Sequence, residues 1–294
     1  MDEKDWKILQ TIHKERNITK ASERLYISQP ALTYRIKQLE ETLNVKILIR
    51  GKKGVDFTAE GEYLVQYANA MLANLVKMKE HLENMDNKIK GTLRLGVSSI
   101  FARYELPMIL SDFLKIHPDI DIVLKTGWSI EMNQMMHKEE AHVGIVRGNY
   151  NWQGKRYLLD EEKIYVVSKH EIELTELPKL PRIFYETDHS LMTLIDSWWE
   201  EKFDAPPHYT MEVDRIDTCR EMVINGLGFA ILPGICIKGF NHLHKIEISS
   251  IYNNDVSRKT WLIYRENALE LSTVKAFVDF IQKRYAKKGY SNNE

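Results

Sequence analysis

The stretch from Ser28 to Leu43, SQPALTYRIKQLEETL, combines a helix start with side chains that could contact nucleic acid. Ser28 can cap a helix, and Pro30 is tolerated in its first turn. Apolar side chains recur at 4-3-4 spacing and predict one buried face: Leu32, Ile36, Leu39 and Leu43. The opposite face carries groups that bond base edges or phosphates, namely Gln29, Thr33, Tyr34, Arg35 and Lys37. A plain amphipathic helix with a solvated polar face is the alternative.

Two shorter elements would position this helix. Apolar residues at helical spacing predict a first helix over Asp5–Lys14, and Thr19 is expected to cap a second short helix. Only Tyr26 to Ser28 separate that second helix from the stretch at Ser28. Two helices joined by so short a turn predict a helix-turn-helix, with the small Ala21 allowing the helices to cross closely.

Residues 44–58 predict a small hairpin with a basic tip. Arg50, Lys52 and Lys53 at this tip would lie against the phosphate backbone or in the neighbouring minor groove as a wing, whereas a solvated turn is the alternative. Residues 1–58 carry 12 Lys and Arg against 8 Asp and Glu, which leaves 29 against 34 for the rest of the chain. The positive end is therefore the candidate nucleic-acid end.

The sequence ASERLYISQPALTYRIKQLE at 21–40, followed by Arg50 and by FTAEG at 57–61, resembles the winged helix-turn-helix of LysR-type transcriptional regulators. The family commonly has two alanines where this chain has Ala21 and Ser22, and Leu-Phe where it has Ile47 and Leu48. The resemblance implies DNA contacts from Ser28, Gln29, Pro30, Thr33, Lys37 and Arg50. Tyr34 and Arg35 are added as candidate DNA contacts only because their side chains are expected on the polar face of the helix.

A long helix is expected over residues 59–88, after a cap at Thr58. Its apolar residues repeat every 3.5 positions, which is typical of a coiled-coil seam: Leu64, Ala68, Met71, Leu75, Met78 and Leu82. Such a helix is about 40 Å long, and its apolar seam must be covered. A second copy of the helix could cover it, which would make a dimer, and packing on the helix's own domain is the alternative. In the resembling family this helix is the dimerising linker, and dimers commonly assemble into tetramers.

Strands alternate with helices after Gly91, which predicts a parallel sheet with right-handed crossovers. Chain crossings near 160–163 and 264–266 would divide this region into lobe I, 91–162 with 265–294, and lobe II, 163–264, joined by a hinge. The order of elements is similar to the family's effector domain, which resembles periplasmic solute-binding proteins. The expected fold is thus an all-α winged helix-turn-helix over 1–58, a coiled-coil linker helix and a two-lobed α/β domain.

Ligands of parallel sheets bind outside the carboxyl ends of the strands. Three predicted strands of lobe I end at such positions, which are Ser98, Ser99, Ile100, Thr126, Gly127, Trp128, Arg147 and Gly148. The serines precede a helix, so they either cap it or help to bind an anion, and Arg147 suits a carboxylate. A small acidic metabolite is therefore the expected effector.

Three runs, at 142–149, 213–233 and 257–264, look most like the citrate-responsive catabolite control branch of the family. That resemblance implies a second arginine, matched here by Arg258, and citrate or a related polycarboxylate as the effector. Thr218 could also face the cleft, with helix capping or core packing as the alternative. Trp128 and Arg103 could reshape the pocket for another acid.

Enzyme motifs such as GxGxxG, GxSxG and the P-loop are missing, so neither an enzyme nor a cofactor is expected. Cys219 and Cys236 fit no disulfide framework or zinc site and are expected to be buried thiols. Without a long apolar run or a signal-like N-terminus, the chain is expected in the cytoplasm and off membranes. The expected partners are inverted-repeat double-stranded DNA, an acidic effector, further copies of the chain and RNA polymerase.

Three rival functions stay open at this point. They are a small-molecule binding protein with an accessory DNA-binding head, a metabolite enzyme with such a head, and an architectural protein without ligand control.

Overall fold

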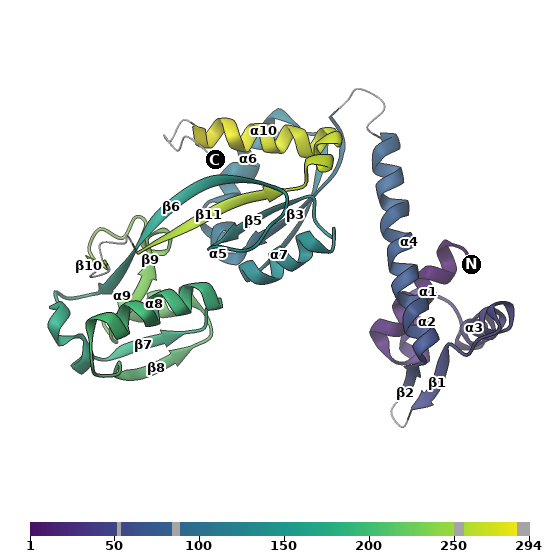
Figure 1. Cartoon of the computed structure of the whole chain (residues 1–294), viewed down its shortest axis with the longest axis horizontal. Helices are drawn as coiled ribbons and strands as arrows, with labels where there is room; N and C mark the ends of the chain where they lie inside the picture. The colour runs from purple at the N-terminus through teal and green to yellow at the C-terminus, as the bar shows by residue number, and fades with distance from the viewer. Residues whose placement is uncertain (52–53, 84–88, 250–255, 287–294) are drawn as a thin grey trace. The chain divides into compact units, whose positions relative to one another are not determined.

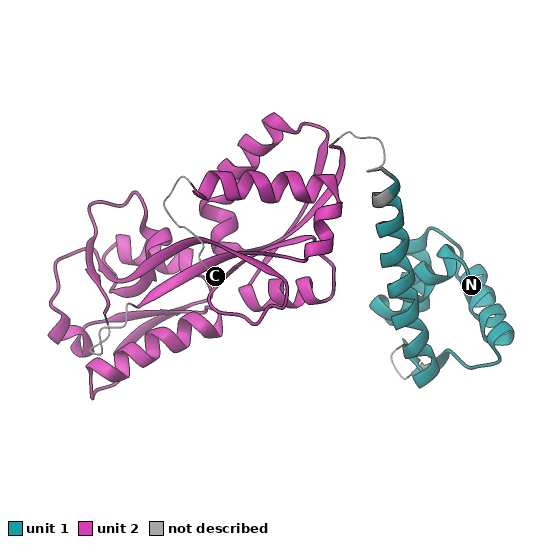
Figure 2. Cartoon of the chain, turned by 45° about the horizontal axis from the view of Figure 1, so that its top comes forward, with its two compact units in different colours: residues 1–86 teal, residues 87–294 magenta. Residues whose placement is uncertain are grey.

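The computed structural model describes residues 1–51, 54–83, 89–249 and 256–286, and the chain divides into two compact units, 1–86 and 87–294 (Figure 2). The first unit combines the helix-turn-helix, the hairpin and the long helix. The second unit holds both lobes of the α/β region. None of the helices in the described ranges is long and apolar enough to cross a bilayer.

The described residues of unit 1 form helices and one hairpin (Figure 1): α1 Glu3–Glu15, α2 Ile18–Leu25, α3 Gln29–Leu43, β1 Leu48–Gly51, β2 Gly54–Phe57 and α4 Ala59–Glu83. Ser28 caps α3 as predicted, because its hydroxyl accepts a hydrogen bond from the Ala31 N–H at 3.4 Å. The cap of α2 is Asn17 rather than Thr19, which lies inside the first turn of that helix. Asn17 is extended and accepts from the Lys20 N–H at 3.0 Å, so the helix begins earlier than predicted.

The core of unit 1 lies where α1, α2 and α3 meet. Leu32, Ile36 and Leu39 are buried as predicted, and Ala21 is wholly buried. Leu43 is 37% exposed, so the buried face of α3 ends one turn earlier than expected. The hairpin packs closely on the end of α1: Gly54 has φ +152°, and a Cβ there would lie 2.3 Å from the Arg16 carbonyl oxygen.

The long helix α4 begins where predicted, with the Thr58 hydroxyl accepting from the Gly61 N–H at 2.9 Å. Its first half packs on α1, as the 2.8 Å hydrogen bond from Gln10 to Asn69 shows. Ala68 is therefore buried in the core of the unit, which corrects its assignment to a seam between copies. Leu64 is only partly buried against that core, so its place in the seam stays a prediction.

Beyond that contact the helix keeps apolar side chains uncovered. Met78 and Leu82 are 51% and 56% exposed, and Met71 and Leu75 are half-buried. Residues 84–88 of the expected helix lie outside the described residues.

Unit 2 begins with lobe I: β3 Gly91–Ser98, α5 Ser99–Tyr104, α6 Leu106–Ile116, β4 Ile120–Gly127, α7 Ser129–His137 and β5 Val143–Arg147. The strand β6, Lys155–Ser168, then leads to lobe II: η2 Leu174–Lys179, β7 Arg182–Tyr185, α8 His189–Lys202, β8 Tyr209–Val213, α9 Ile216–Ile224, β9 Ala230–Pro233, η3 Gly234–Ile237 and β10 His244–Glu247. The chain returns through β11 Ser257–Tyr264, η4 Glu266–Glu270 and α10 Ser272–Ala286.

Two helices follow β3, the short α5 and then α6, and the break between them lies at Glu105. Pro107 lies in the first turn of α6 and has no N–H, so it favours the start of a new helix over the continuation of α5. The last helix, α10, packs on lobe I as predicted, with the rings of Phe277 and Phe113 5.1 Å apart.

The main sheet has the order β10-β6-β11-β5-β3-β4, and β9 also pairs with β6. β3 is parallel to β4 and to β5, as predicted. β11 is antiparallel to β5 and to β6, so the sheet is mixed rather than parallel. The difference arises because β11 comes back from lobe II directly, without a crossover helix. In lobe II, β7 and β8 form a separate parallel pair.

The strands β6 and β11 run from one lobe to the other (Figure 1). From Thr260 onward β11 already pairs with β5 of lobe I. The return crossing therefore lies around Ser257–Lys259, opposite Glu161–Lys163 of β6, and not at the expected 264–266. Two paired strands therefore connect the lobes, and their action as a hinge stays a prediction.

Candidate DNA-reading helix and effector pocket

The first half of α3 presents most of the predicted DNA-contacting side chains to solvent. Ser28, Gln29, Pro30, Thr33, Tyr34 and Lys37 are all exposed. Tyr34 is 65% exposed, and the Thr33 hydroxyl donates to the Gln29 carbonyl at 3.0 Å. The structure therefore brings these six residues together on one accessible helix surface.

Arg35 is turned toward the protein instead. Its Nε and Nη2 atoms donate to the two carboxylate oxygens of Asp5 at 2.6 and 2.9 Å. Asp5 is completely buried and also accepts from the Asp2 N–H in a capping box at the start of α1. Arg35 thus fixes α3 to α1, and its sequence-based role as a DNA contact stays a prediction.

The wing is present as the β1–β2 hairpin, with Arg50 paired opposite Val55. For Arg50 only the backbone is described, and Lys52 and Lys53 lie outside the described residues. The predicted contacts of these three cations with DNA stay predictions.

A cavity of about 450 Å³ lies between the two lobes of unit 2. Eight predicted effector residues line it: Ser98, Ser99, Ile100, Thr126, Gly127, Trp128, Arg147 and Arg258. They lie at the carboxyl ends of β3, β4 and β5 and at the start of β11, as the rule for parallel strands predicts. Gly148 and Thr218 are not among the lining residues; Gly148 turns the chain after β5 with φ +102° and donates to the Lys259 carbonyl at 2.8 Å.

Three lining side chains carry polar atoms that are buried without a partner in the described part of the chain. These atoms are the Ser98 hydroxyl, Nε of Arg147, and both Nε and Nη1 of Arg258. The three residues are at least 96% buried. An unsatisfied buried polar group costs about 1–3 kcal/mol, so a ligand that accepts hydrogen bonds here would be strongly favoured.

Both buried arginines nevertheless have a carboxylate partner. Arg147 forms an ion pair with Glu162, and Arg258 forms one with Asp188. Burial lowers the pKa of Arg147 to about 10. Burial acts to raise the pKa of Asp188, but the charge of Arg258 and the hydrogen bonds that Asp188 accepts lower it below its ordinary value.

These ion pairs also tie the fold together. Glu162, on β6, accepts a hydrogen bond from the Ile235 N–H in η3 at 2.6 Å. Asp188 caps α8 and accepts from Ser190 at 2.6 Å and from Tyr150 of lobe I at 3.3 Å. The pocket residues are therefore part of the packing between the lobes.

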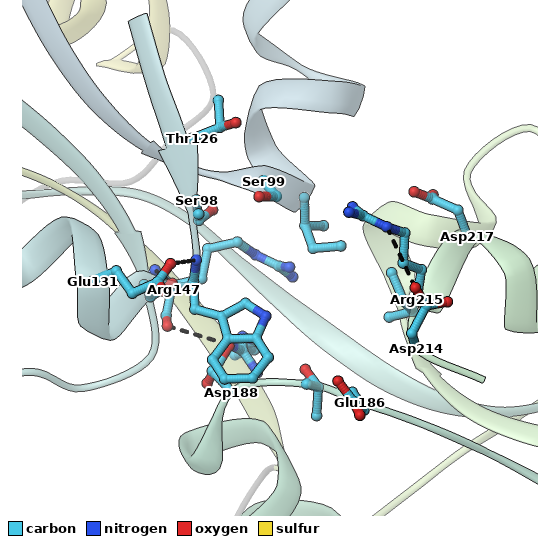
Figure 3. Close-up of a pocket in the computed structure, with 17 residues that line it drawn as sticks. Ser98, Ser99, Thr126, Glu131, Arg147, Glu186, Asp188, Asp214, Arg215 and Asp217 are labelled. Carbon is cyan, nitrogen blue, oxygen red and sulfur yellow. Dashed lines mark hydrogen bonds and ion pairs between the residues drawn. The ribbon is translucent and has the colours of Figure 1, made fainter. Parts of the chain in front are cut away.

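Sequence reasoning missed the lobe II wall of the cavity. Its charged lining residues are Glu186, Asp188, Asp214, Arg215 and Asp217 (Figure 3). Glu186 and Asp214 directly follow β7 and β8, so the strand-end rule would have found them if it had been applied to lobe II. Glu131 on the lobe I side was also missed; it accepts from the Trp128 N–H at 2.8 Å and caps α7.

A second set of contacts joins the lobes beside the cavity. The Tyr104 hydroxyl at the end of α5 hydrogen-bonds Asp217 of α9 and accepts from Arg220 at 2.7 Å. Asp217 also lies 3.2 Å from Arg103, and Lys238 of lobe II lies 2.7 Å from Glu105. Any change in the angle between the lobes must alter this network.

Cys219 and Cys236 are buried free thiols, as predicted. Burial raises the pKa of each to about 12, so neither is a reactive thiolate near neutral pH. Within the described ranges, no group of three or more His, Cys, Asp or Glu side chains could hold a metal ion.

Two family models match the two units of the chain. The "LysR substrate binding domain" matches residues 86–286, and the "Bacterial regulatory helix-turn-helix protein, lysR family" matches residues 4–62. The transcriptional regulator YraN of Bacillus subtilis (strain 168) is 43% identical over 282 residues, which cover 96% of this chain and 98% of YraN.

Solved structures share the fold. CbnR, a LysR family transcriptional regulator, has a TM-score of 0.69 at 17% identity, covering 97% of this chain and 99% of CbnR. CbnR in complex with its target DNA gives a TM-score of 0.68 at 18% identity, covering 96% and 99%. From these matches, the chain belongs to the LysR family and is a DNA-binding transcriptional regulator with a ligand-binding domain, not an enzyme.

Proposed function

We propose that this regulator binds an inverted-repeat DNA site as a homo-oligomer and that a small acidic metabolite in the interlobe cavity controls this binding. Citrate or a related polycarboxylate is the first candidate, from the sequence resemblance to the citrate-responsive branch. The observation that carries the proposal is that one cavity is lined by Ser98, Arg147 and Arg258, three residues that carry unpartnered buried donors. Its volume of about 450 Å³ suits a small metabolite.

The proposal of an oligomer rests on the small number of base pairs that one α3 helix can contact. A single recognition helix contacts only a few base pairs, so useful specificity needs two half-sites. The exposed Met78 and Leu82 on α4, continuous with the half-buried Met71 and Leu75, are the apolar surface available to a second copy. Contact with RNA polymerase would couple the bound oligomer to transcription.

Control by the ligand follows from the hinge. A ligand that bonds both lobes stabilises one angle between them, because β6 and β11 are the two strands that cross. That angle would alter packing between copies and so the spacing of the DNA-reading helices. A binding protein with no control over DNA would show ligand binding without any change in DNA affinity.

The test is a thermal-shift screen of central-metabolism carboxylates on the full chain, followed by DNA-binding titrations with each acid that stabilises it. Ser98→Ala removes one unpartnered donor without breaking an ion pair, so it should weaken the effector while leaving the fold intact. Lys37→Ala is the matched control, because it lies in unit 1 and should weaken DNA binding alone. If no carboxylate stabilises the wild-type chain, the proposal is wrong.

A further inference from the structure

The two walls of the interlobe cavity carry opposite chemistry. The lobe I wall and β11 present unpartnered hydrogen-bond donors on Ser98, Arg147 and Arg258. The lobe II wall presents carboxylates at the ends of β7 and β8. Figure 3 shows Ser98, Thr126 and Arg147 on one side of the pocket and Asp214 and Asp217 on the other.

Backbone pairing brings Glu186 and Asp214 to the same edge. β7 and β8 are parallel neighbours with Tyr185 opposite Val213, and the Glu186 N–H donates to the Val213 carbonyl at 3.1 Å. The next residue on each strand is therefore an acid that follows the last pair. Two carboxylates at adjacent strand ends form one negatively charged edge.

These two carboxylates are weakly engaged by the protein. In the described ranges Glu186 has no side-chain hydrogen bond or ion pair, and Asp214 pairs only with its neighbour Arg215 at 3.9 Å. Asp217, by contrast, is bonded by Tyr104 and Arg103. Glu186 and Asp214 are thus the acids of this wall that remain available to a ligand.

The charges that line the cavity sum to a negative value. Five acids line it, namely Glu131, Glu186, Asp188, Asp214 and Asp217, against the three arginines Arg147, Arg215 and Arg258. The ion pairs Arg147–Glu162 and Arg258–Asp188 are each neutral as a pair, which leaves Glu131, Glu186, Asp214 and Asp217 against Arg215. A ligand with only negative charges would meet the donors on one wall and repulsion on the other.

We propose that the effector is bipolar: its carboxylate is bound by Ser98, Arg147 and Arg258, and a positive charge on the same ligand is held by Glu186 and Asp214. This inference rests on the proposed function, because it assumes an acidic effector in this cavity. The positive charge has two possible sources, the ammonium group of an amino acid or a divalent cation chelated by a polycarboxylate.

A chelated cation would enter with the effector rather than before it. The described residues contain no group of three or more acids, cysteines or histidines that could hold a metal unaided. Two carboxylates leave a divalent cation short of ligands, and the oxygens of a polycarboxylate and water supply the rest.

The experiment uses the full chain and each acid that stabilises it in the carboxylate screen. The affinity of each acid is measured by calorimetry in the presence of EDTA and in the presence of Mg²⁺. Where the acid is an amino acid, its affinity is also compared with that of the matching acid without the amine, such as glutarate for L-glutamate. We expect either Mg²⁺ or the amine to tighten binding by about tenfold or more, as charge-assisted contacts do. In the double variant Glu186→Gln, Asp214→Asn this advantage should fall to less than about twofold.

Glu212→Gln is the matched control, since Glu212 is an exposed acid of β8 that does not line the cavity, and it should keep the full advantage. The bipolar effector is overturned if the affinity is the same in EDTA as in Mg²⁺, the same without the amine as with it, and unchanged in the double variant. That result leaves the proposal of an acidic effector intact. If no acid binds under any condition, both proposals fall together.

Discussion

The two units differ in where their candidate functional side chains lie. On α3 of unit 1, Gln29, Tyr34 and Lys37 are exposed and the core is built from other residues. In unit 2, Arg147 and Arg258 are 1% and 4% exposed and hold ion pairs within the fold. DNA is read from outside, whereas a small ligand needs donors shielded from water. Binding and stability should therefore be separable on the exposed surface of α3 and coupled at the two buried arginines of unit 2.

The largest effect expected from this comparison is that of Arg258→Met. The substitution leaves Asp188 buried without its cation, and breaking such a pair costs about 3–5 kcal/mol. Five of the six tryptophans lie in unit 2, so denaturant unfolding followed by tryptophan fluorescence reports mainly on that unit. We expect the free energy of unfolding to fall by that amount and the response to effector to vanish.

The control for Arg258→Met is the same change combined with Asp188→Asn. Asparagine can still cap α8 but carries no charge, so much of the lost stability should return while the effector response stays absent. If Arg258→Met alone changes stability by less than about 0.5 kcal/mol, stability and binding are separable in unit 2 as well, and the comparison fails.

Asp5→Ala tests the exception in unit 1, a buried ion pair behind the DNA-reading surface. The change removes the partner of Arg35 and the capping box of α1, and we expect a loss of about 2–3 kcal/mol. Hydrogen exchange of α1 and α3 in the full chain would measure it. Arg35 is partly exposed, so water compensates for some of the lost hydrogen bonding. A change in DNA affinity without faster hydrogen exchange in α1 and α3 would contradict this structural role.

The same pair makes unit 1 sensitive to acid. Burial acts to raise the pKa of Asp5, but the Arg35 hydrogen bond and the Asp2 N–H lower it below its ordinary 3.8. A carboxyl with a lowered pKa in the folded state contributes stability that is complete above its unfolded pKa and is lost as pH falls through the folded value. The stability difference between wild type and Asp5→Asn should therefore shrink below about pH 4. A difference that persists at lower pH would contradict the shift.

Sequence reasoning succeeded where the signal is local. The Ser28 cap, the Thr58 cap and the lobe I strand ends each depend on neighbouring residues or on a single periodic pattern. It missed features that depend on distant pairs: Asp5 with Arg35, Tyr104 with Asp217, and the antiparallel direction of β11. No spacing in the sequence encodes those contacts.

Two other differences have distinct causes. The lobe II acids were missed although their signal was local, because the strand-end rule was applied to one lobe. Ala68 was assigned to a seam between copies, because the pattern that marks a helix contact does not say whether the contact is with α1 or with another copy. Ala68 fits both arrangements, and only its burial against α1 decides between them.

Gln29→Ala should affect binding without affecting the fold. An amide that pairs with one base contributes about 1–3 kcal/mol of discrimination, so we expect weaker binding and relaxed preference at one position of each half-site. The melting temperature should not change, since Gln29 is exposed. Gln134→Ala, an exposed glutamine of unit 2, is the matched control. Equal loss of affinity for all DNA sequences would show that Gln29 contacts the backbone instead.

The smallest effect expected is that of Lys37→Ala. This variant tests whether DNA binding depends on the position of a positive charge on α3 or only on the net charge of the protein. The Lys37 side chain is 72% exposed and lies 3.8 Å from Glu41, so its loss should leave stability unchanged. If Lys37 contacts a phosphate, the slope of log affinity against log salt concentration should fall by about one for each bound α3 helix. Lys115 of unit 2 is equally exposed and also pairs with an acid on its own helix, Asp112. Lys115→Ala removes the same charge, so an equal change of slope in both variants would mean that net charge, and not the surface of α3, governs binding to DNA.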